Sequence, residues 1–309
     1  MSGSQTKTVF QRQGDPYLYL YVDQEWYCYN PDEQPLGGGA MGTVWRGYRV
    51  KTRSPIAVKR VKDEYVNIPI IRERARLESS MAFRHPNLIE MIGCCMVHPD
   101  KGPIWLLSNF VNGEEIDKFV KRLSDVMPKA EIISKLICQV LDALEYIHAN
   151  GIIHRDIKPS NIMIENESNA RLMDLGIARM NGGNRFSQPG FIGTPQYAAP
   201  EQITRDVNST VPISASTDIY SLGVTFYELL AGVNPFDMES EMETLSRQLH
   251  EPLPPSDLIP NRLMQVLLKA TEKQPSQRYR TATDFKEAII DAMSPTPSLW
   301  QSVWNWFSI

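Results

Sequence analysis

The chain has 309 residues, of which 42% are hydrophobic and 22% are charged, and its formal net charge is -4. These values are typical of a folded globular protein and exclude a disordered chain. The acidic balance argues against a nucleic-acid-binding surface spread over the whole molecule. At this length, two lobes sharing one cleft are a natural arrangement.

The cysteines and the N-terminal residues indicate the cellular compartment to expect. Cys28, Cys94, Cys95 and Cys138 lack metal-ligand spacing, and the adjacent pair is poorly placed to form a disulfide. We therefore expect reduced thiols that act as small core residues. Residues 1–13 contain no apolar signal segment, and no uninterrupted run of about 18 apolar residues predicts a spanning helix. We expect a cytoplasmic protein.

Residues 1–32 are expected to form an N-terminal extension. Residues 1–16 are expected to be disordered. Residues 17–22 and 26–29 are rich in strand-forming aromatics and predict a β-hairpin across Asp23-Gln24.

A small sheet with one helix is predicted between residues 33 and 108. The pattern is strand-like at 43–50, 56–61 and 104–107, and helical at 70–83.

Helical periodicity takes over beyond residue 112. Apolar residues recur at steps of three and four from Ile132 to Ile147, and Asn150-Gly151 provides a stop signal. Further helices are predicted at 217–230, 261–272 and 282–292.

The last segment, 293–309, combines a Pro/Ser linker with a tryptophan-rich tail. Trp300, Val303, Trp304 and Phe307 share one helical face. Two interpretations stay open, namely interfacial contact with a membrane and packing on the rest of the chain or on a partner.

Two segments point to a nucleotide. Gly37, Gly39, Gly42 and Val44 match G-x-G-x-x-G-x-V, in which glycines let a backbone approach phosphates. A glycine-rich hairpin turn would explain this pattern equally well, but a strand rather than a helix follows, which argues against a dinucleotide site. Fifteen residues after Val44, a β-branched strand ends in Lys59, a cation that can pair with phosphates. Together the two segments predict a nucleotide-binding site.

Three further motifs identify a family. His154-Arg-Asp-Ile-Lys-Pro-Ser-Asn161, Asp174-Leu-Gly176 and Ala199-Pro-Glu201 follow the glycine loop and the lysine strand in this order. The series resembles the protein kinase family, and in particular bacterial Hanks-type serine/threonine kinases, over roughly residues 33–292. The resemblance implies an α+β, two-lobed protein kinase fold, with a small β-sheet N-lobe (33–108) carrying one main helix and a larger, mostly helical C-lobe (109–292).

The resemblance also implies a role for each charged residue. Asp156 accepts the proton of the attacking hydroxyl, and Lys158 neutralises charge on the migrating phosphoryl group. Asn161 and Asp174 are oxygen ligands for Mg²⁺, with Mn²⁺ as a possible substitute. Lys158 at its position is typical of serine/threonine rather than tyrosine kinases.

The expected cofactors are ATP and Mg²⁺. The residues expected to contact ATP are Gly37, Gly39, Gly42, Val44, Ala57, Lys59, Asn109, Val111 and Met163. The expected partners are ATP and proteins bearing Ser or Thr, but not nucleic acid.

The glutamate that should pair with Lys59 has two candidates, Glu73 and Glu78. In most relatives it lies nine residues before the H-P-N turn, but here that position is Arg76. A longer linker would select Glu73, with Leu77 as the spine residue one helical turn later. We predict Glu73.

Other residues have structural roles by resemblance. His154 is expected to be a packed core imidazole, Asp218 a buried aspartate at a helix start, and Arg278 the partner of Glu201. Gly113 aligns with the glycine that follows the hinge, which places Ser108 at the gatekeeper position behind the adenine, with Met91 or Met96 able to fill the space.

The expected activity is transfer of the ATP γ-phosphoryl group to protein Ser or Thr hydroxyls, with autophosphorylation. Arg155 suggests a phosphorylated activation segment, with Ser187 as the expected acceptor and Thr194 as a structural hydroxyl. A pseudokinase scaffold is the main alternative, but Lys59 and the other catalytic positions are all present. A small-molecule phosphotransferase of similar fold would more often carry H-G-D and lack the A-P-E segment.

Overall fold

The computed structural model describes residues 8–39, 41–80, 83–123, 129–174, 194–204 and 211–294. It divides into two compact units. The first consists of residues 1–119 and 146–192 and holds the strands. The second consists of residues 120–145 and 193–309 and is helical in its described part. No helix in the described ranges is both long enough and apolar enough to cross a membrane.

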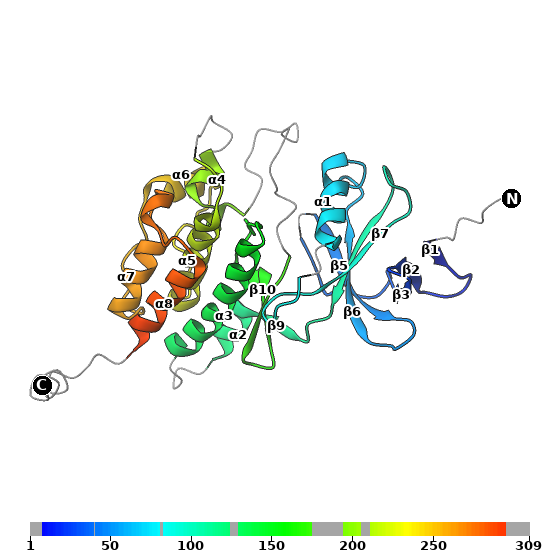
Figure 1. Cartoon of the computed structure of the whole chain (residues 1–309), viewed down its shortest axis with the longest axis horizontal. Helices are drawn as coiled ribbons and strands as arrows, with labels where there is room; N and C mark the ends of the chain where they lie inside the picture. The colour runs from blue at the N-terminus through cyan, green and yellow to red at the C-terminus, as the bar shows by residue number, and fades with distance from the viewer. Residues whose placement is uncertain are drawn as a thin grey trace, which may run out of the picture. The chain divides into compact units, whose positions relative to one another are not determined.

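The first unit contains an antiparallel sheet with one main helix (Figure 1). Its strand order is β1-β2-β3-β5-β6-β8-β7, and β4 pairs with β5. Helix α1 packs on β7 and β8. These elements confirm the predicted small sheet with one helix. Their bounds are β1 Val9–Gln11, β2 Leu18–Val22, β3 Glu25–Tyr29, β4 Gly37–Gly38, β5 Gly42–Arg49, β6 Pro55–Val61, α1 Pro69–Ser80, β7 Met91–Met96 and β8 Ile104–Asn109.

The predicted N-terminal hairpin is confirmed. Strands β2 and β3 pair in antiparallel register, and Asp23 and Gln24 have φ values of 46° and 63°, as in the two-residue turns that match the strand twist. The expected disorder of residues 1–16 is wrong for β1, which pairs with β2. The ring of Phe10 stacks on that of Tyr19, with centroids 4.9 Å apart.

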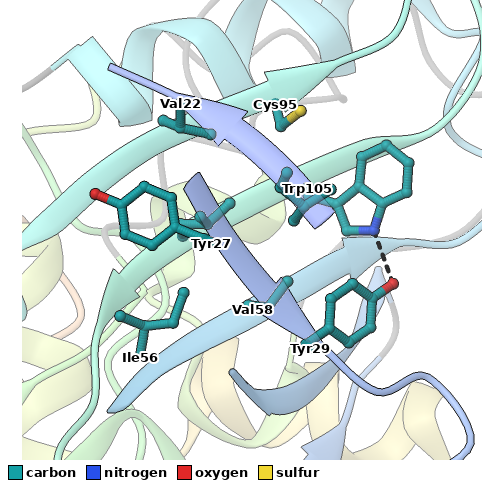
Figure 2. Packing of buried hydrophobic residues seen from close by; sticks show 9 residues of the cluster. Val22, Tyr27, Tyr29, Ile56, Val58, Cys95 and Trp105 are labelled. Atoms are coloured by element: carbon teal, nitrogen blue, oxygen red, sulfur yellow. Dashed lines mark hydrogen bonds between the residues drawn. The ribbon is translucent and has the colours of Figure 1, made fainter. Parts of the chain in front are cut away.

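The extension is a structural part of the sheet. Strand β3 pairs with β5, and side chains of β2 and β3 cover one sheet face (Figure 2). The indole of Trp105 donates a buried hydrogen bond of 2.9 Å to the Tyr29 hydroxyl. Glycine at position 93 leaves room for Val22 of β2, because a Cβ there would lie 2.4 Å from Val22 Cγ1. This apolar cluster contains Leu20, Val22, Tyr27, Tyr29, Ile56, Val58, Cys95, Trp105 and Leu107.

The opposite sheet face packs against α1. Side chains alternate along β8, so Trp105 and Leu107 join the first cluster while Ile104 and Leu106 join a second one. Ile71 and Ala75 bring the inner face of α1 onto this second cluster.

A second, three-stranded sheet belongs to the same unit. It is ordered β11-β10-β9, from β9 (Gly113–Glu115), β10 (Ile162–Glu165) and β11 (Asn169–Leu172). The Ile89 amide donates to the Leu172 carbonyl at 2.9 Å, and the Leu172 amide donates to the Asn87 carbonyl at 2.8 Å. These bonds explain why the compact unit does not end at the predicted boundary after residue 108.

The second unit is built around α5 (Ala215–Ala231), whose residues are nearly all buried. The helix starts with a capping box between Ser214 and Thr217 and ends at Gly232 in the left-handed conformation. Asp218 is fully buried near its start, as expected. The other helices are α4 Pro200–Thr204, α6 Glu241–His250, α7 Asn261–Ala270 and α8 Ala282–Met293, while α2 Ile116–Arg122 and α3 Lys129–Ala149 contribute to both units.

Two other structural expectations are confirmed. Both guanidinium amino groups of Arg278 donate to the Glu201 carboxylate at 2.8 Å, and neither side chain is more than 1% exposed. All four cysteines are free thiols, and burial raises the pKa of Cys94 and Cys95 to about 12. The tail residues 295–309 lie outside the described residues.

Candidate active site

The glycine loop is a hairpin formed by β4 and β5. Gly37 pairs with Val44, and the Gly39 amide donates to the Gly42 carbonyl at 2.9 Å. A Cβ on Gly42 would lie 2.6 Å from the Arg60 carbonyl oxygen, so close strand packing requires glycine there. A Cβ on Gly39 would meet no described heavy atom within 4 Å. The space beside Gly39 is therefore compatible with close approach of a ligand to the backbone.

Lys59 lies in β6 directly opposite Val44 of the glycine hairpin. Its Nζ forms an ion pair of 2.7 Å with Asp174 Oδ2. Burial acts to lower the pKa of Lys59, but the carboxylates of Asp174 and Glu78 outweigh it and raise that pKa. The Lys59 charge in turn lowers the pKa of Asp174. Both side chains therefore stay ionised, which suits them for phosphate and metal contacts.

The glutamate beside Lys59 is Glu78, so the prediction of Glu73 is corrected. Glu73 is exposed, and Leu77, expected to fill an apolar spine, is 40% exposed. Glu78 is 8% exposed and lies on the inner face of α1 with Ile71 and Ala75. Burial raises the pKa of Glu78 to about 7, partly offset by the charge of Lys59. The spacing of Ile71, Ala75 and Glu78, four and then three residues, is the sequence signal that identifies the inner face.

The predicted catalytic loop, residues 154–161, holds Asp156 from several directions. Asn161 donates through Nδ2 to the Asp156 carbonyl at 2.7 Å and to Oδ2 at 3.2 Å. Lys158 Nζ lies 3.4 Å from the same Oδ2. His154 is fully buried and its Nε2 lies 2.9 Å from the Met173 carbonyl, which confirms the predicted packing role. The Asp156 carboxylate is thus oriented rather than mobile.

Asn161 and Asp174 are brought together by the backbone, because the amide of Met173 donates to the Asn161 carbonyl at 2.8 Å. The Asn161 amide nitrogen is used by Asp156, so its side-chain oxygen is the atom available to a cation. An amide oxygen and a carboxylate suit a hard divalent ion. The described residues contain no group of three or more His, Cys, Asp or Glu side chains arranged for a metal.

The electrostatics place these residues in one site. Asp156 raises the pKa of Lys59 and opposes the lowering of the Asp174 pKa. The charges of Lys59, Asp156 and Asp174 are therefore close enough to act on one another.

The strand register supports the predicted gatekeeper. Ser108 pairs with Ala57 on one side and with Met91 on the other, and alternation places it on the Lys59 face of the sheet. Met91 packs on the α1-side cluster beside it. The Asn109 amide donates to the Glu90 carbonyl at 2.9 Å, which fixes the start of the hinge that leads to Val111.

Met163 lies in β10 between Ile162 and Ile164, which are buried. Since strand side chains alternate, the half-buried Met163 faces the other side of this sheet. Of the activation segment, Leu175, Gly176 and Ser187 lie outside the described residues, whereas Thr194 lies within them.

Comparison with known proteins gives consistent matches. A family model described as the protein kinase domain matches residues 31–289. The chain is 32% identical over 272 residues to serine/threonine-protein kinase PknB of Mycobacterium tuberculosis H37Rv, covering 85% of this chain and 42% of the relative. It is also 32% identical over 266 residues to PknH of Mycobacterium bovis, covering 84% of this chain and 43% of PknH. The chain thus spans less than half the length of these curated relatives.

The fold also matches solved structures. A crystal structure of the Mycobacterium tuberculosis PknI kinase domain aligns with a TM-score of 0.63 at 23% identity. The alignment covers 94% of this chain and all of that one.

Proposed function

This chain belongs to the protein kinase family, and from this premise we propose that it transfers the γ-phosphoryl group of ATP to Ser and Thr hydroxyls of proteins, with Mg²⁺ as the cofactor. The observation that carries the proposal is the Lys59–Asp174 ion pair. The charges of Glu78 and Asp156 also act on Lys59, and the Asp156 carboxylate is held in one orientation. A scaffold that only binds ATP would not need the Asp156 carboxylate to be oriented beside these charges.

Each residue then has a distinct task. The glycine hairpin lies over the phosphates, and Lys59 balances their charge. Bound Mg²⁺ would neutralise the phosphate oxygens, and Asn161 and Asp174 are the residues that would hold it. Asp156 orients the acceptor hydroxyl and accepts its proton, while Lys158 stabilises charge on the transferred group.

The preference for Ser and Thr rests on Lys158 and on the likeness to named serine/threonine kinases. The lysine lies 3.4 Å from the carboxylate that would accept the proton, where it can contact the transferred phosphoryl group. We further propose that Ser187 is an autophosphorylation site, since an arginine, Arg155, precedes Asp156.

The test is a transfer assay with purified protein, radiolabelled ATP and Mg²⁺ on a generic protein substrate, followed by phosphoamino acid analysis. Label on phosphoserine and phosphothreonine is expected, and it should disappear in Lys59→Met. Unlabelled protein with intact ATP binding would indicate a scaffold, while label on a small acceptor alone would indicate a small-molecule phosphotransferase.

A further inference from the structure

A fully buried glutamine supports the segment that precedes Glu201. Gln248 lies on the inner face of α6 and is 0% exposed. Its Oε1 accepts a hydrogen bond of 2.5 Å from the Tyr220 hydroxyl, and its Nε2 donates at 2.5 Å to the Gln196 backbone carbonyl. One side chain therefore links the central helix α5 to the turn Pro195–Tyr197.

Lys273 fixes the direction of this chain of hydrogen bonds. Its Nζ donates to the Tyr220 hydroxyl at 2.8 Å and to the backbone carbonyl of Gln248 at 2.9 Å. The same Nζ lies 4.7 Å from the Phe236 ring centroid. An ammonium group only donates, so the Tyr220 hydroxyl directs its own proton to Gln248, where the side-chain Oε1 at 2.5 Å is a nearer acceptor than the backbone oxygen at 3.4 Å. The Gln248 amide nitrogen is then directed at the Gln196 carbonyl.

The ammonium is the form expected at neutral pH. Burial and the neighbouring Arg278 lower the pKa of Lys273 to about 8. The proton that orders the chain is therefore present when the protein is at pH 7, and the bonds polarise one another in surroundings of low dielectric constant.

The supported turn is also held by its side chains. The Tyr197 hydroxyl donates to Glu228 at 2.6 Å, and Gln196 Nε2 donates to Asp237 at 3.0 Å. These two bonds fix side chains, whereas Gln248 fixes the backbone itself. Gln248 is thus placed to set the path of the chain from Thr194 to Ala198.

We propose that Gln248, oriented by Lys273 through Tyr220, is a positioning residue for the protein substrate. The inference rests on the proposed kinase function and takes the segment 194–198, just before Ala199-Pro-Glu201, as part of the surface that receives the protein substrate. A loosened backbone there weakens peptide binding and leaves the nucleotide site of the first unit unchanged. This predicts a selective effect on the Michaelis constant for protein substrate.

The test is Tyr220→Phe, which removes one oxygen from the middle of the chain. Tyr227→Phe is the matched control, because Tyr227 lies on the same helix, is 4% exposed and bonds to Ser256 instead. Expected for Tyr220→Phe are a Michaelis constant for protein substrate raised by about fivefold or more and an unchanged constant for ATP. Amide hydrogen exchange in a peptide spanning 194–198 should also be faster than in the control. Lys273→Met should behave like Tyr220→Phe, and Lys273→Arg should retain most of the wild-type substrate affinity.

The two readouts separate this inference from the proposed function. Equal exchange in Tyr220→Phe and Tyr227→Phe would overturn the positioning role, whether or not the enzyme is active. Faster exchange with an unchanged Michaelis constant for protein substrate would overturn the link to substrate binding. A parallel rise in the Michaelis constants for protein substrate and for ATP would also overturn it. A wild-type protein that transfers no phosphate would instead refute the proposed function.

Discussion

Replacing Glu78 with Gln tests which glutamate of α1 serves Lys59. The substitution keeps the shape of a buried side chain and removes its charge, and Glu73→Gln on the exposed side of the same helix is the matched control. We expect Glu78→Gln to lower kcat/KM by about tenfold or more, because Lys59 loses one of the carboxylates that hold its charge in place. Glu73→Gln should leave kcat/KM within about twofold.

The same pair of variants should differ in how stability depends on pH. The folded-state pKa of Glu78 is about 7, against an ordinary value of 4.5, so the folded state holds this proton more tightly than the unfolded state. Below pH 4.5 both states are protonated and the group has no effect. Between pH 4.5 and pH 7 the free energy of unfolding falls as the pH rises. Above pH 7 the ionised Glu78 lowers it by about 3 kcal/mol in total. Glutamine does not titrate and escapes this penalty.

The assay is urea unfolding of wild type, Glu78→Gln and Glu73→Gln at pH 5 and pH 8. Relative to wild type, the free energy of unfolding of Glu78→Gln should rise by about 2 kcal/mol between the two pH values. No such trend is expected for Glu73→Gln. Loss of activity in Glu73→Gln with normal activity in Glu78→Gln would refute the assignment, and a flat difference across pH would refute the shifted pKa.

Three further predictions follow from the site and the sheet. Asp156→Asn and Asp174→Asn should each reduce phosphoryl transfer by orders of magnitude in folded protein, with ATP binding, measured by titration calorimetry, better preserved in the first; near-native turnover of Asp156→Asn would refute the catalytic loop. Ser108→Met should weaken bulky C3-substituted pyrazolopyrimidine inhibitors by about tenfold, or about 1.4 kcal/mol, with little change in the Michaelis constant for ATP; equal inhibition would show that Ser108 is not the gatekeeper. Gly93→Ala should lower the free energy of unfolding by about 2 kcal/mol, since its Cβ would clash with Val22 Cγ1 and a side chain disfavours the φ of 157° found there; unchanged thermal stability would contradict the packing of β2 on β7.

Local patterns were enough to predict the motif-bearing elements. Glycines, the β-branched strand at Lys59 and the catalytic loop carry chemistry in their residue types, so their order identified the family. The hairpin across Asp23-Gln24 was equally local, because two strands of aromatics flanked a two-residue turn.

Local sequence patterns do not predict contacts between distant segments. The choice of Glu73 relied on linker length, whereas the phase of α1 was decided by burial of Ile71 and Ala75. Arg72 shows the limit more clearly, since it is 1% exposed and donates to backbone carbonyls of Pro99 and Gly102, about thirty residues away. No spacing along the sequence indicates such partners.

Because β2 lies over Gly93, that position and the extension should vary together among related sequences. A kinase that lacks strands before its glycine loop has no side chain in the position of Val22 above the corresponding site of β7. The steric reason for glycine is then absent, and only the φ of 157° at this position still favours glycine. Glycine at that site, together with an apolar residue in the position of Val22, would therefore mark relatives that share the covered sheet. The match to the family model begins only at residue 31 and so leaves out the strands of the extension. This two-residue signature would therefore identify relatives with the extension that a match to the family model alone does not distinguish.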